Sequence, residues 1–134
     1  MSKTILIVDD ERLLTRTLTN ALRDAGYSVL AAESAEQAEK HLSGADGPDL
    51  VILDNRLPRK SGLDVLREIR AADRPCRVIL MTAYGGSEVR KEAQRLKVDR
   101  YVLKPFDLET MMLTVSELLA QDDPLHGTAR IGGR

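Results

Sequence analysis

Five polar residues stand where apolar segments of this sequence stop, and their types suit chemistry on a charged group. The acids Asp9 and Asp10 follow the first such segment, and Asp54 closes a later one. Thr82 and Lys104 close two more. If these segments are strands of an open parallel sheet, their carboxyl ends meet at one edge, where binding sites form. We therefore expect these side chains to converge there.

Close approach of the acidic side chains predicts a bound cation. Carboxylates that lie together repel one another, and their pKa values rise unless a positive charge compensates. A set of oxygen ligands without Cys or His favours a hard ion such as Mg²⁺. The ammonium of Lys104 and the hydroxyl of Thr82 then suit an anion with several oxygens beside Asp54, such as a phosphoryl group. The pattern predicts phosphoryl transfer onto the Asp54 carboxylate, giving an acyl phosphate, with the metal and Lys104 stabilising charge on the transferred group.

Each of these residues also has a structural explanation when it is taken alone. An acid at a strand end is commonly a turn residue, and the pair Asp9 and Asp10 before a helix suits an N-terminal cap. Thr82 alone is commonly structural. Lys104 can simply leave a strand, because Pro105 biases it to an extended backbone. Their joint appearance at successive strand ends favours the functional interpretation.

Short apolar segments alternate along the chain with segments of helical spacing. The third and fourth apolar segments do not alternate with polar residues, as expected for strands covered on both faces. The order predicts an α/β domain with a mostly parallel sheet and helices on both faces. We expect strands near 4–8, 27–33, 49–54, 77–82 and 100–104, and helices near 14–25, 34–43, 63–70, 87–96 and from 107 onward.

Local signals predict where four of the helices begin or end. Gly26 is expected to stop the first helix. Ser34 and Gln37 have the spacing of a capping box. Ser87 and Asp107 are the expected N-caps of the fourth and fifth helices.

Composition restricts the classes of protein to which the chain can belong. Its 134 residues suit one domain, and a formal charge of −1 argues against a nucleic-acid-binding surface. A single cysteine, Cys76, excludes an internal disulfide, and no apolar run is long enough to span a bilayer. We expect a cytoplasmic protein without membrane or direct nucleic-acid contacts, with a domain at 1–121 and a flexible tail or linker at 122–134.

Four stretches resemble the receiver domain of a bacterial two-component response regulator: "ILIVDDE", "VILDNRLPRKSGLDVL", "VILMTAYG" and "YVLKPF". The resemblance covers about 3–120. It implies a flavodoxin-like (βα)5 three-layer sandwich with a parallel five-stranded sheet in the order 2-1-3-4-5. "LDNRLP" and "LKPFDLE" resemble especially the receivers of ATPase-type transcription activators.

The resemblance implies a role for each residue at the strand ends. Asp54 would accept a phosphoryl group from a sensor histidine kinase or a phosphotransfer protein. Asp9, Asp10 and Asp54 would hold Mg²⁺ together with the backbone carbonyl of Arg56. Lys104 would pair with the phosphoryl group. Beyond this self-catalysed transfer and slow autodephosphorylation, no enzymatic turnover is implied.

Further positions match the switch and loops of the same family. Thr82 would hydrogen-bond to the phosphoryl group and move toward it, and Tyr101 would then turn inward. Pro58 and Gly62 match loop positions, and Pro105 matches a proline that is often cis.

The resemblance also implies tuning residues and an interaction surface. Arg56 and Tyr84 are expected to hinder or guide the water that removes the phosphoryl group. The fourth helix, fifth strand and fifth helix would form the surface for a homodimer or a downstream output domain. Exposed charges expected on that surface are Arg90, Lys91, Glu92, Asp99, Arg100 and Glu109; the basic residues Arg56, Arg59 and Lys60 are expected in a solvated loop.

Three other interpretations stay open at this point. A haloacid-dehalogenase-like phosphatase also uses an Asp after a strand, but it carries a second Asp where this chain has Arg56. A receiver-shaped binding module that works without phosphorylation is the second. A nucleotide-binding fold is the third, although no Gly-rich loop with Lys-Ser/Thr is present. His41 and His126 are expected at the surface or in the tail rather than as phosphodonors.

Overall fold

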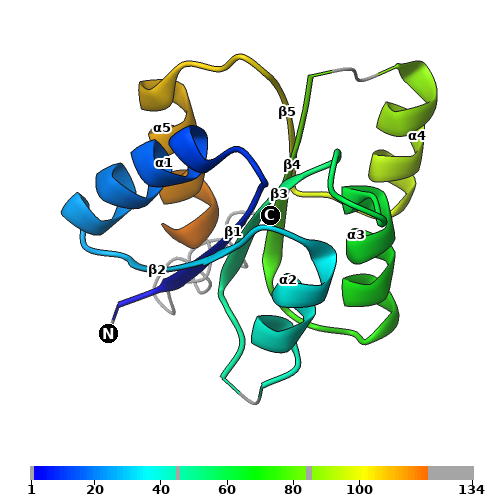
Figure 1. Cartoon of the computed structure of the whole chain (residues 1–134), viewed down its shortest axis with the longest axis horizontal. Helices are drawn as coiled ribbons and strands as arrows, with labels where there is room; N and C mark the ends of the chain where they lie inside the picture. The colour runs from blue at the N-terminus through cyan, green and yellow to red at the C-terminus, as the bar shows by residue number, and fades with distance from the viewer. Residues whose placement is uncertain (1, 45, 84–85, 121–134) are drawn as a thin grey trace, which may run out of the picture.

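In the described chain, five parallel strands alternate with five helices, as expected (Figure 1). The computed structural model describes residues 2–44, 46–83 and 86–120. The sheet order is β2-β1-β3-β4-β5, which confirms the flavodoxin-like topology. The elements are β1 (Thr4–Val8), α1 (Arg12–Asp24), β2 (Ser28–Ala32), α2 (Ala35–Leu42), β3 (Leu50–Asp54), α3 (Gly62–Ala71), β4 (Arg77–Thr82), α4 (Ser87–Arg95), β5 (Arg100–Leu103) and α5 (Leu108–Ala120).

The sheet separates two apolar cores. Successive side chains of a strand point to opposite faces, so Val51 and Leu53 of β3 pack beneath α2, α3 and α4. Leu50 and Ile52 pack beneath α1 and α5 on the other face. Figure 1 shows these two helix layers on either side of the sheet. Because both faces are covered, the central strands have no solvent-facing position, which explains their continuous apolar sequences.

The expected helix caps were partly right. The hydroxyl of Ser34 accepts from the amide of Gln37 at 3.2 Å, and the Asp107 carboxylate accepts from the amide of Thr110 at 3.1 Å. Ser87 is not the cap of α4, because it is already the first residue of the helix. Gly86 is the N-cap, with extended backbone angles (φ −66°, ψ 168°), and no side chain of the described residues caps this end of the helix.

Two further expectations concern the tail and a membrane span. The predicted tail at 122–134 lies wholly outside the described residues. Among the helices that are described, none has the length and apolar character needed to cross a bilayer.

Candidate functional site

The polar strand ends converge at the carboxyl edge of the sheet, as the sequence predicts. One carboxylate oxygen from each of Asp9, Asp10 and Asp54 lies within 4.8 Å of the others. Lys104 lies beside them, and the backbone oxygen of Thr82 accepts from its amide at 2.9 Å. A pocket of about 470 Å³ opens here, lined by Asp10, Glu11, Asp54, Arg56, Leu57, Pro58, Ala83 and Lys104.

The ammonium of Lys104 is the positive centre of this pocket. Its Nζ lies 2.8 Å from Asp9 Oδ2, 2.8 Å from Glu11 Oε1 and 3.5 Å from Asp54 Oδ2. Burial lowers the pKa of Lys104, but the hydrogen bonds to Asp9 and Glu11 and the nearby negative charges outweigh it and raise the pKa overall. The ammonium is therefore a fixed charge at neutral pH.

Asp9 uses its two carboxylate oxygens for two different contacts. Its Oδ1 accepts from the backbone amide of Glu11 at 2.9 Å, which ties the chain at the N-cap of α1. Its Oδ2 accepts from the Lys104 ammonium at 2.8 Å. The expected cap by Asp9 or Asp10 was therefore wrong: Glu11 is the N-cap of α1, no side-chain cap hydrogen bond is made there by the described residues, and Asp9 Oδ1 closes a local turn before the helix.

The Asp54 carboxyl carries the electrostatic conflict expected from the sequence. Burial and then the charge of Asp9 raise its pKa to about 6, although Lys104 and the Arg56 amide act in the opposite direction. A divalent cation in the pocket would remove this conflict. The donor atoms are all oxygen, which fits Mg²⁺.

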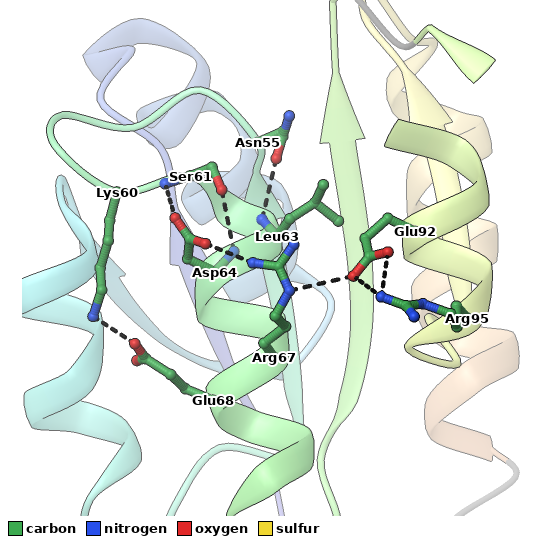
Figure 2. A network of polar contacts seen from close by, with 9 residues as sticks. All are labelled: Asn55, Lys60, Ser61, Leu63, Asp64, Arg67, Glu68, Glu92 and Arg95. Carbon is green, nitrogen blue, oxygen red and sulfur yellow. Dashed lines mark hydrogen bonds and ion pairs between the residues drawn. The ribbon is translucent and has the colours of Figure 1, made fainter. Parts of the chain in front are cut away.

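The loop after Asp54 is held close against α3. Asn55 accepts from the Gly62 amide with its backbone oxygen at 2.9 Å and from the Leu63 amide with its side chain at 3.1 Å. Ser61 and Asp64 form a reciprocal capping box, visible in Figure 2. Sequence reasoning missed this cap, although the Ser-x-x-Asp spacing is a recognised signal for one.

Gly62 is the first residue of α3 rather than a residue before it, and it lies against the Asp54 peptide. A Cβ at Gly62 would fall well inside contact distance of the Asp54 carbonyl oxygen and 2.9 Å from the Cα of Asn55. Its backbone has no positive φ, so close approach, not turn geometry, explains the glycine.

The remaining expected site residues have varied surroundings. Arg56 and Pro58 lie on the pocket wall, and the Lys104–Pro105 peptide is cis. Tyr101 packs against the core beneath α4, and its buried hydroxyl has no hydrogen-bond partner among the described residues. The guanidinium of Arg90 lies 5.1 Å from the centre of the Tyr101 ring. Tyr84 lies outside the described residues.

The expected set of exposed charges near α4 and β5 was wrong for two residues. Asp99 is largely buried: its carboxylate accepts from the amide of Val78 at 2.7 Å and from Arg70 and Arg77. Glu92 is held between Arg67 of α3, at 3.3 Å, and Arg95 of its own helix, at 2.7 Å (Figure 2). Both carboxylates are occupied by partners within the chain, because α3 and the start of β4 lie beside them.

We expect Asp99→Ala to lower the free energy of unfolding by about 2–3 kcal/mol, because it leaves a buried amide and paired arginines without their acceptor. Urea unfolding measures this change. Glu117→Ala is the matched control, since its carboxylate is exposed and lies 4.0 Å from Arg100. Equal losses in both variants would contradict a special role for Asp99.

The basic loop was expected to be solvated: Arg56 and Arg59 are exposed, whereas Lys60 is only partly exposed. Arg59 pairs with Glu36 of α2, and Lys60 pairs with Glu39 of α2 and Glu68 of α3. These pairs attach the loop after Asp54 to its flanking helices.

Of the two histidines, His41 lies half-buried in the last turn of α2, and His126 lies outside the described residues.

Comparison with known proteins agrees with this geometry. Residues 5–116 match the response regulator receiver domain family. Regulatory protein AtoC of Escherichia coli (strain K12) is 40% identical over 115 residues, covering 86% of this chain and 25% of that protein. Sporulation initiation phosphotransferase F of Bacillus subtilis (strain 168) is 33% identical over 119 residues, covering 89% of this chain and 95% of that protein.

A solved structure is similar over nearly the whole chain. The non-phosphorylated HemR receiver domain from Leptospira biflexa aligns with a TM-score of 0.84 and 28% identity, covering 92% of this chain and 98% of that chain. By contrast, this chain spans 54% of virulence transcriptional regulatory protein PhoP of Salmonella typhimurium (strain 14028s / SGSC 2262) and about a quarter of AtoC.

Proposed function

Because the chain belongs to the response regulator receiver domain family, we propose that it is a signalling switch activated by phosphorylation of Asp54. The observation that carries this proposal is the Asp54 carboxylate itself, buried beside Asp9 and opposite Lys104 at the pocket. An Asp54 oxygen attacks the phosphorus of a phosphohistidine. The oxygen–phosphorus bond forms as the phosphorus–nitrogen bond breaks, and the imidazole leaves as a neutral ring that keeps the proton already on its other nitrogen.

Asp9, Asp10, Asp54 and the carbonyl of Arg56 would hold Mg²⁺ in this proposal. When bound, the ion offsets negative charge on the transferred group. The residues of the chain supply the rest: Lys104 offers an ammonium to the phosphoryl oxygens, and the buried acids keep it oriented.

The switch acts through Thr82, Lys104 and Tyr101. A phosphoryl group adds negative charge and acceptor oxygens, which attract the Thr82 hydroxyl and the ammonium. This biases an equilibrium between two forms of the domain. The surface that responds is formed by α4, β5 and α5, where Arg90 contacts the Tyr101 ring and Leu103 is 53% exposed. Phosphorylation that changed neither self-association nor amide exchange on this surface would contradict the proposed output.

In this proposal the domain acts in the cytoplasm. Its partners are a sensor histidine kinase or a phosphotransfer protein, a second copy of the domain, and an output region. Similarity to virulence transcriptional regulatory protein PhoP, about half of which this chain spans, supports an output in transcription regulation. The similarity to sporulation initiation phosphotransferase F, which this chain spans almost fully, supports a standalone relay role as the second candidate.

The test is phosphorylation by acetyl phosphate with and without Mg²⁺, followed by intact mass, in wild type and Asp54→Asn. We expect one phosphoryl group that requires Mg²⁺ and is absent from the variant.

Decay of the same adduct in Arg56→Ala and Tyr84→Ala tests the tuning roles, which predict a changed dephosphorylation rate. Absence of an adduct with both acetyl phosphate and a kinase would favour a binding module that works without phosphorylation. Turnover of an added phosphate ester would favour a phosphatase.

A further inference from the structure

Glu11 shares the ammonium of Lys104 with the buried acids. Its Oε1 lies 2.8 Å from Lys104 Nζ, although Glu11 and Lys104 are 93 positions apart in the sequence. Asp9 Oδ2 lies at the same distance from Lys104 Nζ. Glu11 is the N-cap residue of α1, and its side chain does not cap that helix. Instead, the Glu11 carboxylate accepts a hydrogen bond from Lys104, and Glu11 lines the pocket.

The carboxylates around Lys104 are held to different degrees. Asp9 is buried and fixed from both sides, by the Glu11 amide at one oxygen and by Lys104 at the other. Glu11 is on the solvent side, with 61% of its side chain exposed. Asp54 is the most distant of the three from the ammonium, at 3.5 Å. Glu11 is thus the partner that Lys104 can release at the least cost, because water readily solvates an exposed carboxylate.

We propose that Glu11 is a positioning residue that competes with the phosphoryl group for Lys104. This inference rests on the proposed phosphorylation of Asp54. An ammonium has three N–H donors, and Glu11 takes one of the two that are engaged at 2.8 Å. When oxygens of a phosphoryl group appear on the Asp54 side, Lys104 turns toward them and gives up Glu11.

If Glu11 competes for Lys104, removing its charge should make phosphorylation faster. Glu11→Gln removes a charged partner of Lys104 and a negative charge at the pocket mouth, both of which oppose an anionic donor. With Mg²⁺ saturating, we expect phosphorylation by acetyl phosphate to be about two- to fivefold faster than in wild type, the range that one exposed ion pair spans. The faster phosphorylation of Glu11→Gln should persist at a saturating donor concentration. Easier approach of an anionic donor would help only below saturation, whereas release of Lys104 from Glu11 acts on the bound donor as well.

Glu33→Gln is the matched control. It removes the same charge from an exposed ion pair, with Arg12 at 3.2 Å, and Glu33 neither touches Lys104 nor lines the pocket.

A second measurement is independent of phosphorylation: the ¹⁵N resonance of the Lys104 ammonium in Mg²⁺-free protein. We expect Glu11→Gln to shift this resonance and Glu33→Gln to leave it in place.

The outcomes separate this inference from the proposed function. If wild type gains no phosphoryl group while Lys104 responds to Glu11→Gln, the proposed function fails and the competition fails with it. Three results overturn the competition alone, with wild type phosphorylated normally. These are an unchanged or slower rate in Glu11→Gln, the same acceleration in Glu33→Gln, and a Lys104 resonance that Glu11→Gln does not move.

Discussion

Asp54→Asn is expected to raise the free energy of unfolding by about 1–3 kcal/mol at pH 8 in Mg²⁺-free buffer. Burial and the charge of Asp9 raise the pKa of Asp54 from 3.8 to about 6, so the folded protein disfavours the ionised carboxylate. A difference of about two pKa units corresponds to about 3 kcal/mol and already includes the attraction to Lys104. This figure is the upper bound, because the Asn amide must also find hydrogen-bond partners at the buried position. Urea unfolding of wild type and variant measures the gain.

The gain from Asp54→Asn should depend on pH in one direction. Because the folded pKa of Asp54 is higher than the unfolded one, the folded state binds the proton more tightly. The cost of the charged carboxylate is fully present above pH 6 and disappears as the pH falls from about 6 to about 4. The advantage of the variant should therefore be largest at pH 8 and close to zero near pH 4.

Two controls identify the source of this effect. Asp46→Asn removes the same charge from an exposed loop and should change stability little at either pH. Saturating Mg²⁺ should stabilise wild type and narrow its difference from Asp54→Asn, since a ligand of the folded state stabilises by mass action. A variant less stable than wild type at pH 8 would show that attraction to Lys104 outweighs burial and repulsion.

Gly62→Ala is expected to lower the free energy of unfolding by about 3 kcal/mol and to reduce phosphorylation of Asp54 more than tenfold. The added Cβ would meet the backbone of Asp54 and Asn55, which cannot rotate away as a flexible side chain does. The helix start or the strand end must shift, and the strand end carries Asp54, the proposed phosphoacceptor. Urea unfolding and the acetyl phosphate assay measure the two losses.

Gly44→Ala is the matched control for Gly62→Ala. A Cβ at Gly44 meets no atom within 4 Å, and its backbone has no positive φ. The control should keep the stability and phosphorylation of wild type. If Gly62→Ala also behaved as wild type, the contact between α3 and the Asp54 peptide would be loose enough to take a methyl group, and glycine would not be required there.

The sequence alone determined the order of the elements and the positions of the acids within them. Apolar patterning is local and periodic, so the strands and helices could be located to within a few residues from the chain itself. The rule that parallel strands end at one edge then placed Asp9, Asp10 and Asp54 together before any coordinate was known. The same patterning could not tell which side chains of β3 face which helix layer, because every position of that strand is apolar and buried.

Only the tertiary structure decided the charge pairs and the close approaches. Lys104 meets Glu11 across 93 positions, Asp99 meets Arg70 across 29, and the Gly62 backbone touches the Asp54 peptide. Charged side chains follow no sequence period that names their partners, and a distance of a few ångströms depends on how separate elements pack. That is why Asp99 was expected at the surface and is buried, and why Glu11 had no role until Lys104 was seen beside it.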